Sequence, residues 1–92
     1  MNEKLIEQKL RDKVKQLGGI ALKFVSPSFT GVPDRIVLMP GGNIWFVEVK
    51  STGKGVSARQ KIVFPMFEKL GFRVELIDTE EKLNTLLKEM GK

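Results

Sequence analysis

The sequence predicts one mixed α/β domain over residues 1–92. Three observations predict it: apolar residues recur at helical spacing at both ends of the chain, short apolar runs bounded by turn residues lie between them, and 92 residues leave no room for two cores. The expected order is α-β-β-β-α-β-α. The expected elements span residues 3–17, 20–25, 34–39, 43–50, 57–70, 72–77 and 79–90.

The first helix follows from the spacing of its apolar residues. Its stripe consists of Ile6, Leu10, Val14 and Leu17, and Gly18-Gly19 ends it. The apolar run over residues 20–25 then predicts a strand. The turn-rich segment 26–33 (SPSFTGVP) predicts a loop before the next strand.

The middle of the chain predicts a hairpin and a capped helix. Two apolar runs flank Pro40-Gly41-Gly42, which is typical of a hairpin loop. Further on, Ser57-x-x-Gln60 is a capping-box pattern that starts the second helix, and Gly71 ends it. Pro65 lies inside this helix and is expected to kink or break it.

Composition excludes several kinds of chemistry. The chain contains no cysteine, so it has no disulfide and no thiolate zinc site. It also contains no histidine and no tyrosine, which excludes imidazole acid–base catalysis, histidine-ligated metals and a tyrosine nucleophile. Any catalysis must therefore use Asp, Glu, Lys, Ser or Thr, with an oxygen-bound metal where one is needed.

The net charge of +5 is concentrated in one segment. Residues 49–61 carry four basic side chains and no acid: Lys50, Lys54, Arg59 and Lys61. Such a segment suits a polyanionic partner, although a solvated loop and helix start would look the same. The chain opens without an apolar signal segment and has no apolar run long enough for a membrane span, so we expect a cytoplasmic protein without a membrane partner.

The strand at residues 44–50 carries a carboxylate and an amine on one face. Side chains alternate along a strand, so Glu48 and Lys50 point the same way while Val47 and Val49 point the other way. Charged groups in so apolar a strand are costly unless they are paired or used. They form either a structural salt bridge or part of a site.

The hairpin decides between these two interpretations. With a three-residue loop, Met39 faces Asn43 and Asp34 falls opposite Glu48, where Cβ atoms of paired residues lie about 4.5–5.5 Å apart. Two adjacent carboxylates repel each other and need a cation, and Mg²⁺ prefers such oxygen ligands. A two-residue loop would move Asp34 to the other face of the sheet.

A third acid is predicted on the first helix. Glu7 lies about 65° from the centre of the apolar stripe, where it could reach over the sheet toward the carboxylate pair. Glu3 lies closer to the stripe centre, but it belongs to the first turn, where the helix dipole and solvent account for an acid.

Polar residues near the second helix form the rest of the candidate site. Gln60 is explained by the capping box alone, yet its helix starts one loop after Lys50, and the free amides there, with Arg59 and Lys61, suit a phosphate. The loop hydroxyls are further candidates for phosphate contact: Ser26, Ser28 and Thr30.

These residues resemble a known nuclease pattern. Glu7 … Gly31-Val32-Pro33-Asp34-Arg35 … Glu48-Val49-Lys50 … Gln60 resembles the PD-(D/E)XK pattern and, more narrowly, the VRR-NUC (virus-type replication–repair nuclease) family. The resemblance extends from the first helix through the fourth strand. It implies a restriction-endonuclease-like α-β-β-β-α-β core and a Mg²⁺- or Mn²⁺-dependent phosphodiesterase that leaves a 5′-phosphate and a 3′-hydroxyl.

The resemblance also implies a role for each matching residue. Asp34, Glu48 and the main-chain carbonyl of Val49 would ligate the metal, and Lys50 would orient or help deprotonate the attacking water and offset transition-state charge. Glu7 matches the helical acid of the pattern, as a catalytic and metal-binding residue. Gln60 matches its glutamine.

Small members of this family resemble Holliday-junction resolvases, which cut four-way DNA junctions as homodimers. The DNA-binding candidates are then Lys54, Arg59, Lys61, Ser28 and Thr30. A small core independently favours a dimer. Its interface would use apolar residues from Trp45, Phe64, Met66 and Phe67, among which the sequence does not decide.

Two other hypotheses stay open at this point. The same site would serve a flap, nick or non-specific DNA nuclease, or the catalytic module of a larger complex. A basic nucleic-acid-binding domain without catalysis would also show the positive segment, with its acids acting only as salt bridges.

Overall fold

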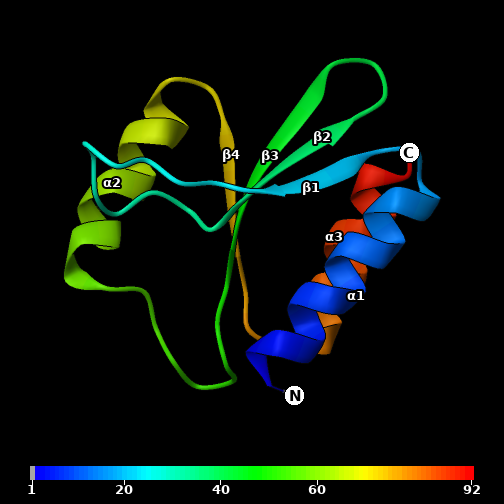
Figure 1. Ribbon diagram of the computed structural model, residues 1–92, viewed down its shortest axis with the longest axis horizontal. Coiled ribbons are helices and arrows are strands. Elements are labelled where there is room, and N and C mark those ends of the chain that lie inside the picture. The colour runs from blue at the N-terminus through cyan, green and yellow to red at the C-terminus, as the bar shows by residue number, and fades with distance from the viewer. Residues whose placement is uncertain (1) are drawn as a thin grey trace.

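The computed structural model describes residues 2–92 and places a sheet between helices on both faces (Figure 1). Its elements are α1 (Glu3–Gln16), β1 (Ile20–Lys23), β2 (Arg35–Met39), β3 (Asn43–Val49), α2 (Ala58–Lys69), β4 (Arg73–Ile77) and α3 (Glu80–Met90). The predicted order and mixed α/β class are confirmed. The first strand is two residues shorter than predicted.

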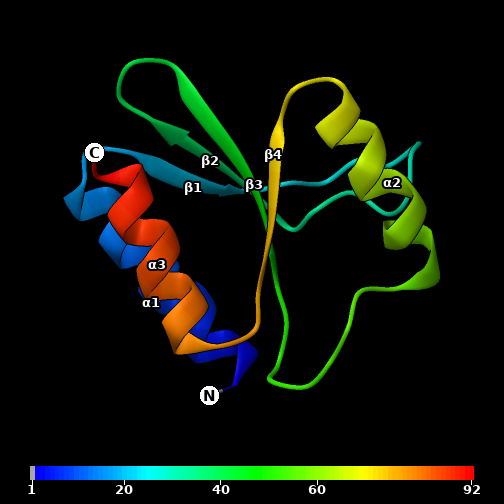
Figure 2. The ribbon, with the colours of Figure 1, turned by 180° about the vertical axis from the view of Figure 1, so that it is seen from behind.

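The four strands form one mixed sheet in chain order, β1-β2-β3-β4. The first two pairs are antiparallel, whereas β3 and β4 are parallel and are joined by α2 as the crossover. Figure 2 shows α1 and α3 together on one side of the sheet and α2 on the other. The two edge strands are therefore β1 and β4.

Each face of the sheet packs its own set of apolar side chains. On the side of α1 and α3 the main core contains residues of both helices and of the odd-numbered sheet positions, with Ile6, Leu10, Val37, Val47 and Leu83 fully buried. Phe46 lies on the opposite face, in edge-to-face contact with Phe67 of α2 at 4.9 Å between ring centroids and with Phe72 at 5.6 Å. Because helices cover both faces of the sheet, β3 shows an apolar run rather than an alternating pattern.

The hairpin between β2 and β3 has the predicted three-residue loop. Met39 pairs with Asn43 and Arg35 pairs with Val47. Gly41 and Gly42 both have positive φ, at 86° and 80°, which side chains with a Cβ adopt only at a cost. The register on which the site prediction depends is therefore confirmed.

The second helix begins as predicted and continues through Pro65. The hydroxyl of Ser57 accepts a hydrogen bond from the Gln60 amide, and the Gln60 side chain accepts one from the Ser57 amide, each at 3.1 Å. No break occurs at Pro65, because helical residues follow it up to Lys69. Pro65 and Lys61 are exposed, so water can bind the carbonyl of Lys61 that proline leaves without a donor. Within residues 2–92, no helix is long and apolar enough to cross a membrane.

The loop before β2 packs against α2 and needs a glycine there. Gly31 has a φ of +85°, and a Cβ at this position would lie 2.6 Å from Cγ of Arg59 and 3.0 Å from Cγ2 of Val63. The Arg59 guanidinium also lies 5.3 Å from the Phe29 ring centroid, in a cation–π contact. This packing holds the chain segment that leads into Asp34.

We predict that Gly31→Ala destabilises the fold by about 2–5 kcal/mol, because a positive φ costs about 1–2 kcal/mol and overpacking about 1–3 kcal/mol. The matched control is Gly53→Ala, which has a φ of +86° but nothing within 4 Å of the added Cβ. It should cost only about 1–2 kcal/mol, the cost of the positive φ alone. Urea unfolding measures both, and equal losses would contradict the steric argument.

Candidate active site

The two predicted carboxylates lie side by side at the open end of the hairpin. The β2–β3 register sets Asp34, just before β2, opposite Glu48. Each carboxylate accepts a hydrogen bond from the neighbouring strand: the Asp34 amide donates to Glu48 Oε1 at 3.0 Å, and the Val49 amide donates to Asp34 Oδ2 at 3.3 Å. At this end of the β2–β3 ladder, carboxylate oxygens accept hydrogen bonds that main-chain carbonyls accept elsewhere in the sheet. These two hydrogen bonds hold both carboxylates in place.

Glu48 is a buried carboxylate with several partners. Its side chain is only 1% exposed, and its Oε2 lies 2.9 Å from Lys50 Nζ. Burial raises the pKa of Glu48, the negative charge of Asp34 raises it further, and hydrogen bonds from Lys50 and Gln60 oppose the rise. The net effect is a pKa above the ordinary value. A buried acid beside a second acid is the environment expected of a functional carboxylate.

The Glu48 carboxylate stabilises the cationic form of Lys50. Its hydrogen bond with Glu48 is the main cause that raises the pKa of Lys50, and the charges of Asp34 and Glu3 add to it. Glu3 therefore lies within electrostatic reach of the site, although the sequence explained it by its place in the first helical turn. The interaction of Glu3 with Lys50 arises because the start of α1 lies near the end of β3 in the folded chain. No local sequence pattern predicts that arrangement.

Glu7 lies elsewhere than predicted. Its Oε1 is 3.8 Å from Nε of Arg35, whose side chain points to the face opposite that of Asp34. No group of three acids close enough to hold a metal ion is found among residues 2–92. The structure therefore brings together Asp34, Glu48 and Lys50 but not Glu7, whose catalytic role stays a prediction.

Gln60 both caps its helix and contacts the candidate site, the two roles that the sequence left open. Its side-chain oxygen accepts the hydrogen bond of the capping box, and its side chain also hydrogen-bonds Glu48, which lowers the pKa of that carboxyl. The residue is 8% exposed. The cap thus fixes the start of α2 against the end of β3, and the two interpretations are compatible.

The predicted phosphate-binding residues surround this cluster at the surface. Exposed side chains are found at all five positions: Ser28, Thr30, Lys54, Arg59 and Lys61. Arg59 is already engaged, because its Nε donates to the Thr30 carbonyl at 3.4 Å as well as contacting Phe29. Ser26 is half-buried. The N–H of Val49 faces Asp34, and its carbonyl points to the same side of the strand because both groups of a residue do so in a ladder.

The residues suggested for a dimer interface are mostly used inside the protein. Trp45 and Phe64 are buried, and Phe67 packs in the aromatic cluster with Phe46. Met66 is 47% exposed and is the one of the four that remains at the surface.

Two carboxylates and a lysine at the end of a hairpin in a mixed sheet form the arrangement expected of a metal-dependent nuclease, and comparison with known proteins shows a nuclease family. The VRR-NUC domain family model matches residues 1–81. The "Putative nuclease p44" of Acyrthosiphon pisum secondary endosymbiont phage 1 is 41% identical over 81 residues, which cover 88% of this chain and 87% of that protein. A solved structure described as "VRR_NUC domain" superposes with a TM-score of 0.87 at 26% identity and covers 94% of both chains.

The chain therefore belongs to the VRR-NUC family of nucleases. The resemblance stated from the motif is confirmed. The matched region includes every residue of the Asp34, Glu48, Lys50 and Gln60 cluster.

The raised pKa of Glu48 predicts a pH-dependent stability. Because the folded state binds this proton more tightly than the unfolded state, stability from Glu48 is fully present below its ordinary value of 4.5 and is lost as the pH rises through the folded-state pKa. Glu48→Gln lacks this loss. In urea unfolding with EDTA, the free energy of the variant minus that of the unmodified protein should increase from pH 4 to pH 7, by about 1.4 kcal/mol per unit of pKa elevation. A decrease would show that the ion pair with Lys50 outweighs burial.

Proposed function

We propose that this chain is a metal-dependent DNA endonuclease that hydrolyses phosphodiester bonds, with Asp34, Glu48 and Lys50 as its centre. The single observation that carries the proposal is the buried Glu48, held opposite Asp34 by the hairpin register and 2.9 Å from Lys50 Nζ. A purely structural salt bridge would not need a second carboxylate beside a carboxylate that is 1% exposed.

The donor set suits a small divalent cation. Two carboxylates and the Val49 carbonyl are oxygen ligands, and Mg²⁺ or Mn²⁺ commonly binds through one or two carboxylates, waters and substrate phosphate. The mutual repulsion of Asp34 and Glu48, which raises the pKa of Glu48, is the repulsion that a cation would relieve. Such an ion, when bound, lowers the pKa of attacking water and neutralises charge on the phosphate.

The protein's own residues complete the chemistry. The raised pKa of Lys50 keeps it protonated at neutral pH, so it offsets the negative charge that develops on the phosphate and orients the attacking water. Gln60 holds Glu48 in position through its hydrogen bond, and its helix presents its first amides beside the site. Glu7 is kept as a secondary candidate, because a shift of its side chain away from Arg35 would be needed to join the carboxylates.

We predict that Asp34→Asn and Glu48→Gln each lower cleavage by at least about 100-fold, because they remove charge where a cation and phosphate must be balanced. DNA binding should be kept. Glu81→Gln is the matched control, since it also removes one carboxylate but lies on α3 among exposed residues. Cleavage of a labelled DNA by each purified variant measures this, and full activity in Asp34→Asn would exclude the assignment.

Saturating Mg²⁺ or Mn²⁺ should raise the melting temperature of the unmodified protein and of Glu81→Gln, but not of Asp34→Asn, because a ligand that binds only the folded state stabilises it. Differential scanning fluorimetry with EDTA as the reference measures the shift. An identical shift in all three proteins would assign the effect to non-specific ions. No shift, with DNA binding intact, would favour a non-catalytic binding domain.

Within this activity, we propose junction resolution by a homodimer. The relative found in a phage and the small core support it, since a two-fold dimer would set two sites against two symmetry-related strands. Such a protein would act on DNA in the cytoplasm of a bacterium or a phage-infected cell.

A labelled four-way junction and a matched linear duplex, each with Mg²⁺, Mn²⁺ or EDTA, test this proposal. Paired, metal-dependent cuts confined to the junction are expected, together with a dimer in analytical ultracentrifugation. Equal cutting of both substrates would keep the nuclease and reject the resolvase in favour of a flap, nick or non-specific enzyme.

A further inference from the structure

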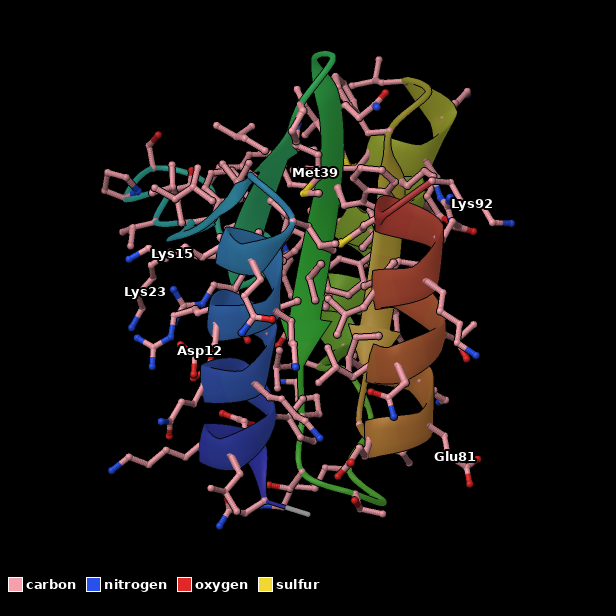
Figure 3. The ribbon with its side chains drawn as sticks, turned by 90° about the vertical axis from the view of Figure 1, so that its right-hand side faces the viewer. Asp12, Lys15, Lys23, Met39, Glu81 and Lys92 are labelled. Atoms are coloured by element: carbon pink, nitrogen blue, oxygen red, sulfur yellow. The ribbon has the colours of Figure 1, made fainter. Side chains whose placement is uncertain are left out.

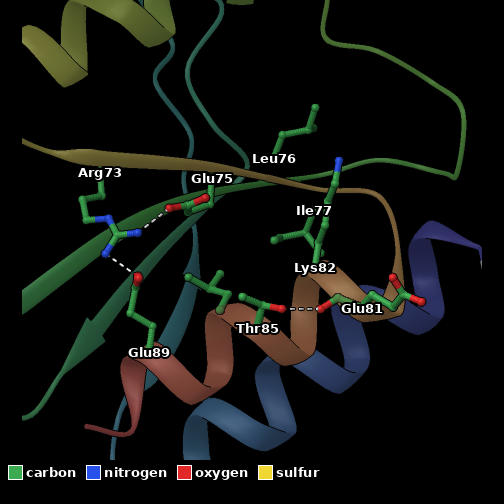
Figure 4. Close-up of a pocket in the computed structure, with 9 residues that line it drawn as sticks. Arg73, Glu75, Leu76, Ile77, Glu81, Lys82, Thr85 and Glu89 are labelled. Atoms are coloured by element: carbon green, nitrogen blue, oxygen red, sulfur yellow. Dashed lines mark hydrogen bonds and ion pairs between the residues drawn. The ribbon is translucent and has the colours of Figure 1, made fainter.

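The two edges of the sheet differ in how their charges are used. Along β4 and α3 lies a cleft of about 440 Å³ in which most of the charged side chains take part in ion pairs. Arg73 contacts both Glu75 and Glu89 (Figure 4). Lys82, also in the cleft, lies 2.9 Å from Asp78. Three of the cations and acids that line this cleft are thus paired with one another, Lys82 is paired with Asp78 outside it, and Glu81 is the lining charge without an ion pair among residues 2–92.

At the other edge, α1 and β1 enclose a groove of about 520 Å³ that we call the β1 groove. Gln8, Arg11, Asp12, Lys15, Gly19, Ile20 and Ala21 line it. Arg11 and Lys15 are one helical turn apart and exposed, and neither takes part in an ion pair within the part of the chain that the structure describes. Asp12 is the one acid on its rim.

The positive surface continues from the groove along β1 to the strand end beside Asp34, on the face of the sheet opposite that of the Asp34 side chain. Ala21 packs on the core beneath α1, so Lys23, two residues further along β1, points to the same face. Lys23 is exposed and pairs across the strands with Arg35, the residue next to Asp34. Figure 3 shows Lys15 and Lys23 projecting on the same side of the molecule beside α1.

Arg35 itself is mostly buried, with a side chain that is 12% exposed, so it lies beneath this surface rather than on it. Its Nε is buried without a hydrogen-bond partner among residues 2–92, since Glu7 lies 3.8 Å away. The exposed cations of this surface are therefore Arg11 and Lys15 on α1 and Lys23 on β1, and none of the three takes part in an ion pair among residues 2–92. Arg35, by contrast, forms an ion pair with Glu7.

We propose that the β1 groove binds the phosphate backbone of the nucleic-acid strand that enters the active site; this inference rests on the proposed nuclease function. The four residues of β1 span about 13 Å, which is the length of about four phosphates along one strand of a duplex. Cations without protein partners release counterions when they meet phosphates, and this release drives backbone binding without reading sequence. The cations at the start of α2 would then contact the strand on the other side of the cut.

The proposal is tested with two double variants that remove the same charge from the same protein. Arg11→Gln with Lys15→Gln changes the β1 groove. Lys13→Gln with Lys88→Gln changes the hollow between α1 and α3, where both lysines are exposed and unpaired in the described chain. Binding of a labelled duplex and a four-way junction is measured in EDTA between 50 and 200 mM salt, and melting temperatures verify folding.

The groove variant should bind about 10- to 100-fold more weakly at 0.1 M salt and lose about two units of the salt slope, whereas the control should change less than about threefold. Equal losses in both variants would overturn the proposal, because net charge alone would then explain binding. Binding that survives in the groove variant while the unmodified protein cleaves would overturn the groove and leave the nuclease. Groove-dependent binding without any cleavage would support the groove and reject the nuclease.

A second readout locates the strand directly. The chain has no cysteine, so Lys15→Cys and Lys13→Cys each provide one unique thiol for a photoreactive maleimide. Irradiation should cross-link DNA to position 15 at least about tenfold more than to position 13. Equal cross-linking at both positions would contradict the proposed path.

Discussion

The active site depends on the length of one loop that contributes no atom to it. Three residues between β2 and β3 set Met39 against Asn43 and thereby Asp34 opposite Glu48, five strand residues or about 17 Å away. Removing one residue from this loop would turn Asp34 to the face of α1 and α3 while β3 kept its place in the core. Positive φ at Gly41 and Gly42 permits the loop, so its glycines matter to the chemistry through register alone.

The same register places a charge where packing would favour an apolar side chain. Glu48 follows Phe46 on a face whose other residues form an aromatic cluster, and its burial raises its pKa. Three contacts offset this cost: the Asp34 amide, the Lys50 ammonium and the Gln60 side chain. Since an apolar residue of similar volume would cost less than a buried ion pair, the arrangement is better explained by chemistry than by stability.

Features that depend on neighbours in sequence were predictable, and features that depend on how elements meet were not. The loop length predicted that Asp34 lies opposite Glu48, and Ser57-x-x-Gln60 predicted where α2 begins. Both predictions succeed because turn and cap geometry involve only a few adjacent residues. A helical wheel gives the direction of Glu7 but not the Arg35 side chain that rises from the sheet to meet it. It likewise assigns Glu3 to a solvated first turn, because Lys50, with which Glu3 interacts electrostatically, is 47 residues distant along the chain.

The distribution of charge on α1 is another feature that the sequence alone does not predict. Summed along the chain, residues 1–17 carry only +2, so the basic segment 49–61 dominates any linear reading. In space the helix sorts its charges by face. Glu7 turns to Arg35 and Lys9 to Glu80 of α3, while Arg11 and Lys15 face the edge of β1 without partners among residues 2–92. A segment whose charges nearly balance in sequence therefore presents two cations and one acid at the β1 groove, because a period of 3.6 residues places on different faces the charges that a running sum combines.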